Sequence, residues 1–225
     1  MKVKKTKIKK SVHPADCISQ EELANEYKTV CDNIKFSTAI NEYKIIVVSG
    51  TEDGVGKTLT AANIAISLGK QSKILLIDAD MRKPGQHNLF NVQNTVGLSN
   101  IICDIDKDGE KLHTGAAKNV DLITSGTVPP NPFELLASEK MENILEDAMG
   151  KYDYIVIDTP AINDMVTDAL ALMTDKTGVV IVCQQDRTTI EDLNEINHTI
   201  KLTGANFIGV VLNRSNKNKK HLFLD

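Results

Sequence analysis

Short apolar runs alternate with longer amphipathic segments along most of this chain. The runs are rich in Val, Ile and Leu, which is typical of strands buried on both faces. The expected strands are residues 44–49, 73–77, 120–123, 152–157, 178–183 and 207–212. The expected helices are residues 21–35, 57–68, 134–149, 167–173 and 190–201. This alternation predicts an α/β fold with a doubly wound, mostly parallel sheet and helices on both faces.

The chain divides into one domain and two polar ends. Residues 19–214 are predicted to form a single domain, because 225 residues can bury one large core without needing a second. Residues 1–18 form a basic tail, for which solvated disorder and attraction to anionic lipid both remain open. Residues 215–225 form a polar tail without tyrosines. Ser19 is the expected cap of the first helix, and Gly69 is the expected stop of the second.

Composition and charge exclude several classes of protein. The net charge of −4 gives no reason to expect nucleic acid as a partner. No apolar run reaches the ~18 residues of a membrane span, and the basic start lacks the apolar stretch of a signal peptide. We therefore expect a cytoplasmic protein unless another component carries it to a membrane. The four scattered cysteines predict reduced, mostly buried thiols rather than a zinc or iron–sulfur site.

Three of the expected strands end in residues suited to a nucleotide and its magnesium. After strand 44–49, Gly54 and Gly56 allow the backbone N–H groups to point inward around a phosphate, and the start of helix 57–68 adds its positive end. Lys57 can reach the phosphates, and the Thr58 hydroxyl can bind magnesium. Thr51 stands where the usual pattern has its first glycine. We expect a phosphate-binding loop here.

Acidic residues follow the other two of these strands. Asp78 and Asp80 come after strand 73–77, and Asp158 comes after strand 152–157. If the chain stays extended, the carboxylates of Asp78 and Asp80 point the same way, which suits a magnesium site or a base facing a hydroxyl group. Since the carboxyl ends of parallel strands meet at one edge of a sheet, the pattern predicts a single nucleotide site there.

Longer segments around these motifs resemble one family. They read ILLIDADMRKP at 74–84, TAANIA at 60–65, LITSGTVPPNPFELL at 122–136, IVIDTP at 155–160 and GVVLNR at 209–214. Together they resemble the bacterial tyrosine kinases of capsule and exopolysaccharide synthesis, in the type with a separate cytoplasmic subunit. The resemblance implies a P-loop fold with a deviant Walker A motif, ATP with Mg²⁺, and phosphoryl transfer to protein tyrosine. It also implies activation by the cytoplasmic tail of a membrane adaptor, which would hold the kinase at the inner face of the plasma membrane.

The resemblance assigns roles to particular residues. The expected catalytic residues are Lys57, Asp78 and Asp80. The expected nucleotide contacts are Asp53, Gly54, Val55, Gly56, Lys57, Thr58, Leu59 and Asn213. The expected metal ligands are Thr58, Asp80 and Asp158. For Asn213, an adenine contact and a turn residue both remain open. For Arg82, a phosphate or subunit contact and a structural salt bridge both remain open.

The chain departs from the family pattern in three places. None of its tyrosines lies after residue 154, although the family's tail carries a tyrosine cluster. The helix that bears Glu-x-x-Arg-x-x-Arg for ring assembly has Asn25, Lys28 and Cys31 at those positions, and Ala161 replaces a proline. The first two departures predict a monomer or weak oligomer that does not phosphorylate its own tail and acts on tyrosines of other proteins.

Two other functions are compatible with parts of this pattern. A partitioning or division-site ATPase of the same fold carries a second lysine at the start of the phosphate loop, but this chain has Glu52 there, next to Asp53. Two acids beside a triphosphate oppose a dimer of that kind. A nucleotide-binding regulatory subunit with little kinase activity would explain the missing tyrosines. The kinase ranks first, because every expected catalytic group is present.

Overall fold

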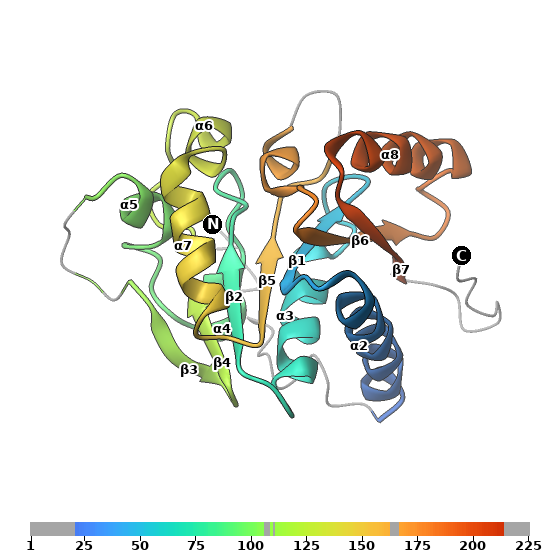
Figure 1. Cartoon of the computed structure of the whole chain (residues 1–225), viewed down its shortest axis with the longest axis horizontal. Helices are drawn as coiled ribbons and strands as arrows, with labels where there is room; N and C mark the ends of the chain where they lie inside the picture. Colours follow the sequence, from blue (N-terminus) through green and yellow to red (C-terminus); the bar gives the residue numbers. More distant parts are fainter. Residues whose placement is uncertain (1–20, 106–108, 110, 163–166, 214–225) are drawn as a thin grey trace, which may run out of the picture.

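The sheet has the predicted doubly wound form. The computed structural model describes residues 21–105, 109, 111–162 and 167–213, and in this part seven strands form one sheet in the order β3-β4-β2-β5-β1-β6-β7 (Figure 1). The strands are β1 (Ile45–Gly50), β2 (Ile74–Asp78), β3 (His113–Ala117), β4 (Val120–Ile123), β5 (Tyr154–Asp158), β6 (Thr177–Gln184) and β7 (Asn206–Asn213). Only β3 and β4 pair antiparallel among these strands. The predicted α/β fold is therefore confirmed.

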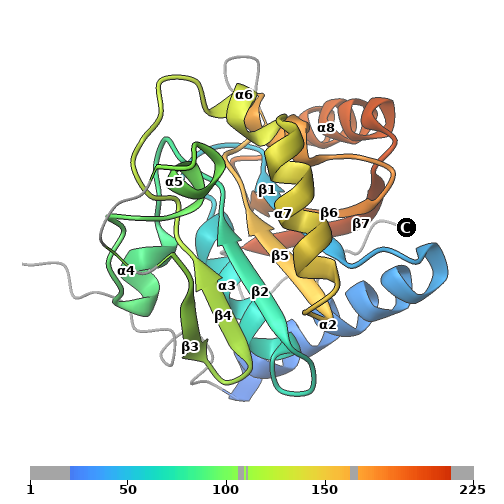
Figure 2. The ribbon, with the colours of Figure 1, turned by 60° about the vertical axis from the view of Figure 1, so that its left-hand side comes forward.

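Helices cover both faces of the sheet. One face packs against α2 (Glu21–Asn41), α3 (Lys57–Leu68) and α4 (Gln86–Phe90). The other packs against α5 (Leu98–Ile102), α6 (Pro132–Leu136), α7 (Glu139–Met149), the 3₁₀ helix η1 (Asp168–Leu172) and α8 (Ile190–Thr203) (Figure 2). Side chains of β1 alternate between two cores: Ile46 and Val48 pack toward α3, and Ile45 and Val47 pack the other way. Burial on both faces explains why the strands read as continuous apolar runs.

The prediction of one helix over residues 134–149 is wrong, because two helices occupy this region. The backbone leaves the first helix after Leu136, and Ser138 adopts an extended conformation (φ −81°, ψ 151°). The Ser138 hydroxyl accepts a hydrogen bond from Met141 N at 3.3 Å and donates one to Leu135 O at 2.7 Å. It therefore caps α7, while Pro132 begins α6.

Other element boundaries also differ from the pattern. The first helix runs on to Asn41 rather than ending near residue 35, because Ile34 and Thr38 extend its buried face. The segment expected as helix 167–173 is the 3₁₀ helix η1. The cap expected at Ser19 lies outside the described residues, whereas Gly69 does follow α3. The sequence pattern missed α4, α5 and β3, which are each five residues long and too short to show a clear period.

The strand order brings the three motif-bearing strands together. In the centre of the sheet β5 lies between β2 and β1, and all three are parallel. The register pairs Asp158 with Asp78 on one side and with Val48 on the other. The expected meeting of the motifs at one edge of the sheet is thus observed.

Candidate nucleotide and metal site

The loop between β1 and α3 has the geometry of an anion-binding turn. Gly54 (φ 82°) and Gly56 (φ 100°) adopt left-handed conformations that other residues rarely take. Among the described residues, no side chain caps α3 at Gly56, and the first turn of α3 contains no acidic residue. The positive end of this helix and its first N–H groups are therefore not compensated by the protein side chains that normally cap a helix. A phosphate group fits this position.

Lys57 lies inside this loop rather than on the surface. Its side chain is only 7% exposed, and a Cβ atom at Gly50 would come within 2.8 Å of Lys57 Cγ. The Lys57 ammonium is 3.7 Å from a carboxylate oxygen of Asp53. Asp53 also pairs with Lys83, and the contact with Lys83 is the main reason why the pKa of Asp53 is lowered. The loop thus holds one buried cation, and an acidic residue draws a second one, Lys83, to its rim.

Asn213, at the end of the edge strand β7, contacts the phosphate loop. It is the last residue of β7, so of the two alternatives left open for Asn213 the turn residue is wrong. Its side-chain amide donates a hydrogen bond to Val55 O at 2.7 Å, and a Cβ atom added at Gly56 would clash with this amide. Asn213 therefore fixes the loop conformation, while an adenine contact stays a prediction.

The three acidic residues lie buried beside the loop. The strand ends at Asp78, so the condition that the chain stays extended as far as Asp80 is not met. Asp78 Oδ2 accepts from Gly85 N at 3.0 Å and from Gln86 N at 2.9 Å, while Asp80 Oδ1 accepts from Lys83 N at 2.9 Å. Asp158 Oδ2 accepts from the Gln86 amide at 2.9 Å. Each carboxylate is thus held in place by a hydrogen bond from the segment 83–86.

Burial raises the pKa of all three carboxyl groups. It raises the pKa of Asp78 to about 7, and the negative charge of Asp80 adds to this effect. Burial also raises the pKa of Asp158, to which the charge of Asp78 contributes further. Desolvation is the main cause of the raised pKa of Asp80 as well. Burial disfavours the ionised form of these three acids, and a cation bound between them would stabilise that form.

The residues fit a hydrated magnesium ion rather than a cage of protein ligands. Within the described residues, Asp78 Oδ1 and Asp158 Oδ1 are buried without a hydrogen-bond partner. In the same part of the chain, no group of three or more His, Cys, Asp or Glu side chains is arranged to hold a metal by itself. Magnesium keeps several waters and binds one or two carboxylates together with substrate phosphates. Thr58, at the start of α3, and the acids could complete such a shell.

Further ion pairs join the site to its surroundings. Arg82 makes a bidentate salt bridge with the buried Asp168 of η1, at 2.6 and 3.2 Å. Of the two roles left open for Arg82, a phosphate or subunit contact and a structural salt bridge, the structure shows the salt bridge. Arg187 pairs with Glu52 at 2.5 Å. The sequence reasoning missed Gln86, Lys83, Asp168 and Arg187; only Lys83 carried a signal, as part of the RKP segment.

The chain is similar in sequence to proteins named as tyrosine kinases. A family model described as an AAA domain matches residues 43–209. The putative tyrosine-protein kinase CapB of Staphylococcus aureus is 34% identical over 193 residues, which cover 85% of this chain and 84% of CapB. The tyrosine-protein kinase YwqD of Bacillus subtilis is 34% identical over 199 residues, covering 88% and 83%. This chain belongs to the bacterial tyrosine-protein kinase family.

Solved structures of this kinase family have the same fold. The crystal structure of the chimerical protein CapA2B2 matches with a TM-score of 0.80 and 30% identity, covering 89% of each chain. The kinase domain of the Escherichia coli tyrosine kinase ETK matches with a TM-score of 0.83 and 26% identity, covering 100% of this chain and 88% of that one. The expected P-loop fold and family are therefore confirmed.

Proposed function

We propose that this protein is an ATP-dependent protein-tyrosine kinase that regulates capsular or exopolysaccharide synthesis. One observation carries the proposal: the uncapped phosphate loop and three buried aspartates meet at the carboxyl edge of β1, β2 and β5. The kinship with CapB and YwqD supports tyrosine as the acceptor.

Each residue has a place in the proposed reaction. Lys57 and the N–H groups of the loop would bind the ATP phosphates, and Thr58, Asp80 and Asp158 would hold Mg²⁺, which offsets phosphate charge when bound. A tyrosine hydroxyl oxygen forms a bond to the γ-phosphorus while the bond from that phosphorus to ADP breaks. Asp80, supported by Asp78, accepts the tyrosine proton.

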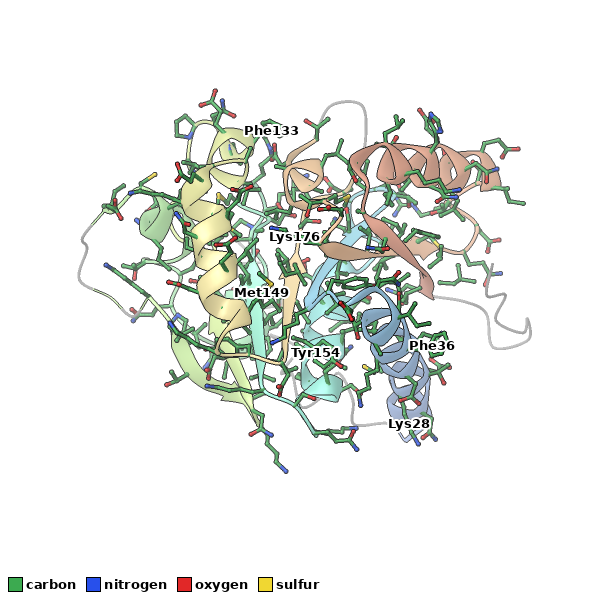
Figure 3. All side chains as sticks on the ribbon, in the orientation of Figure 1. Lys28, Phe36, Phe133, Met149, Tyr154 and Lys176 are labelled. Atoms are coloured by element: carbon green, nitrogen blue, oxygen red, sulfur yellow. The ribbon has the colours of Figure 1, made fainter. Side chains whose placement is uncertain are left out.

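The acceptor tyrosines belong to other proteins. Tyr43 and Tyr152 are buried, with 5% and 8% exposure, and Tyr27 and Tyr154 are half-buried. Tyr154 begins β5, at the end of the sheet opposite the phosphate loop (Figure 3). These four tyrosines are all that the chain contains, and three of them, Tyr43, Tyr152 and Tyr154, lie at or just before the start of β1 or β5, away from the strand ends that carry the site. The hydroxyl of the fourth, Tyr27, donates a hydrogen bond to Thr60 Oγ1 at 3.5 Å.

A membrane adaptor is the proposed partner. No helix of the described residues has the length and apolar character needed to cross a bilayer. In this proposal the cytoplasmic tail of an adaptor holds the kinase at the inner face of the plasma membrane and orders its site. The isolated chain is then a poor enzyme.

Labelled ATP tests the proposal directly. The purified chain is incubated with labelled ATP, Mg²⁺ and a tyrosine-containing protein substrate, with and without a peptide from the cytoplasmic tail of a candidate adaptor. We expect phosphotyrosine on the substrate, increased by the peptide. Nucleotide binding without any phosphotyrosine would instead indicate the regulatory subunit. A partitioning-type ATPase would hydrolyse ATP without labelling protein, but Glu52 is engaged by Arg187 and leaves no lysine to reach across a dimer there.

A further inference from the structure

Gln86 lies where three parts of the site meet. It is the first residue of α4 and is fully buried, although glutamine is usually exposed. The Gln86 side chain contacts two elements of the site, and the Gln86 backbone contacts a third. No sequence motif marks this position.

Both protons of the Gln86 amide are used. Nε2 donates to Thr58 O in the first turn of α3 at 2.9 Å and to Asp158 Oδ2 at the end of β5 at 2.9 Å. The backbone N–H of Gln86 donates to Asp78 Oδ2 at the end of β2, also at 2.9 Å. The residue therefore ties the helix after the phosphate loop to the two central strands that carry the acids.

The remaining oxygen of this amide has no partner in the described part of the chain. Gln86 Oε1 is buried and unpaired within the described residues, as are Asp78 Oδ1 and Asp158 Oδ1. Three residues joined by hydrogen bonds thus each keep one buried acceptor unsatisfied, which is costly unless a cation or water occupies the space. Placing Gln86 for packing alone would leave these oxygens unexplained.

We infer that Gln86 is a positioning residue for Mg²⁺: it holds Asp158 and the Thr58 turn in the relative arrangement that the metal requires. This inference rests on the proposed nucleotide site. Groups that orient metal ligands without touching the metal typically change metal affinity by about 10–100-fold when they are removed. Binding of nucleotide without metal depends instead on Lys57 and the loop N–H groups, which Gln86 does not contact through its side chain.

The test compares nucleotide affinity with and without metal. The dissociation constant of a fluorescent ADP analogue is measured in EDTA and in excess Mg²⁺, for the wild-type chain and for Gln86→Met, which keeps the length but loses both donors. The gain from Mg²⁺ is the ratio of the dissociation constant in EDTA to the dissociation constant in Mg²⁺. For Gln86→Met we expect a dissociation constant in EDTA within about twofold of wild type, and a gain from Mg²⁺ about tenfold smaller than that of wild type. The matched control is Gln71→Met, because Gln71 is exposed and its side chain accepts a hydrogen bond from Lys35, which is not part of the site. Its gain should equal that of wild type.

Three outcomes would decide against Gln86 as a positioning residue. A full gain from Mg²⁺ in Gln86→Met would overturn it, and so would an equal loss of affinity with and without metal, which indicates a purely structural role. If Gln86→Met does not fold, Gln86→Asn replaces it, because the shorter amide cannot reach both Thr58 O and Asp158; an undiminished gain in that variant also overturns the inference. Wild-type protein that binds no ADP in either condition contradicts the proposed function itself.

Discussion

At the scale of single residues, the site combines one buried cation with three buried acids. Lys57 packs against the backbone of Gly50 within the phosphate loop, while Asp78, Asp80 and Asp158 are buried close enough for their charges to interact. The acids repel one another and are desolvated, so the protein without ligand stores an electrostatic cost here. Bound metal and nucleotide would offset that cost, which makes the site more stable when occupied.

The first prediction concerns Lys57. Lys57→Met should reduce phosphotransfer at least about 100-fold, because a charge that stabilises the transferred phosphate is removed. The expected change in melting temperature without ligand is small, since methionine fills a similar volume and no buried ammonium remains. ATP turnover and thermal melting are measured on the same samples. Lys176→Met is the control, because Lys176 is exposed and lies before β6 (Figure 3); normal turnover in Lys57→Met would remove Lys57 from the site.

The second prediction concerns pH. The pKa of Asp78 is raised from 3.8 to about 7 in the folded chain, so the folded state binds more protons than the unfolded state between these values. The free energy of unfolding without metal should therefore be highest at low pH within this window and fall as pH rises toward 7. One pKa unit corresponds to about 1.4 kcal/mol, so the fall should reach a few kcal/mol.

Urea unfolding in EDTA at several pH values between 4 and 8 measures this effect. Asp78→Asn should flatten the curve and raise stability near pH 7, because the amide carries no charge at any pH. An unchanged slope in Asp78→Asn would mean that other groups, such as Asp158, carry the pH dependence.

At the scale of elements, the connection between α6 and α7 shows how one side chain redirects the chain. Ser138 bonds to the helix on each side, which stops α6 and starts α7. Without that cap, the sequence 134–149 favours one continuous helix. The break allows Leu136 on α6 and Met141 on α7 to enter the same core.

The third prediction tests this cap. Ser138→Ala should lower the free energy of unfolding by about 1 kcal/mol, because Met141 N loses its acceptor. Chemical denaturation with an unchanged slope provides the measurement. Ser138→Thr, whose hydroxyl can both accept from Met141 N and donate to Leu135 O, should retain the stability of the wild type. An alanine variant as stable as wild type would show that the cap contributes nothing.

At the scale of the whole molecule, the structure shows where the departures from the family motif at residues 25, 28 and 31 lie on α2. Cys31 is 3% exposed on the buried side of α2, where its thiol faces Ile64 O at 3.8 Å. Asn25 and Lys28 are exposed on the same helix, and Figure 3 shows Lys28 and Phe36 along it. A charge-assisted contact between subunits contributes about 1.5–3 kcal/mol, and Cys31 cannot supply one.

The fourth prediction is that the chain is a monomer or weak dimer that carries no phosphate on its own tyrosines. Light scattering after ATP treatment should give a mass near one chain, 24.7 kDa, at micromolar concentration. Mass spectrometry of the same sample should find all four tyrosines unmodified, because they are buried or half-buried. A stable ring would show that the departures at residues 25, 28 and 31 do not prevent assembly. Phosphate on any of the four tyrosines, or on the tail 214–225, would show that the chain does phosphorylate itself.

The sequence alone determined the parts that depend on neighbouring residues. Strand positions follow from runs such as residues 45–48, since burial on both faces demands apolar side chains there. The glycines of the phosphate loop, Lys57 and the acids at the strand ends were found because their chemistry lies within a few residues of a strand. The boundaries of the short helices could not be found in this way, because a segment of five residues shows no reliable period.

Only the tertiary structure decided which distant residues meet. Asp168 is 86 positions from Arg82, and Asp158 is 72 positions from Gln86, yet each pair shares a hydrogen bond. The order of the central strands, with β5 between β2 and β1, creates the second contact and buries the acids together. Such pairs depend on the path of the backbone between them and on the exclusion of water around them. Neither is encoded in the spacing of the residues, so the burial that raises the pKa values of the acids emerges only when the sheet is assembled.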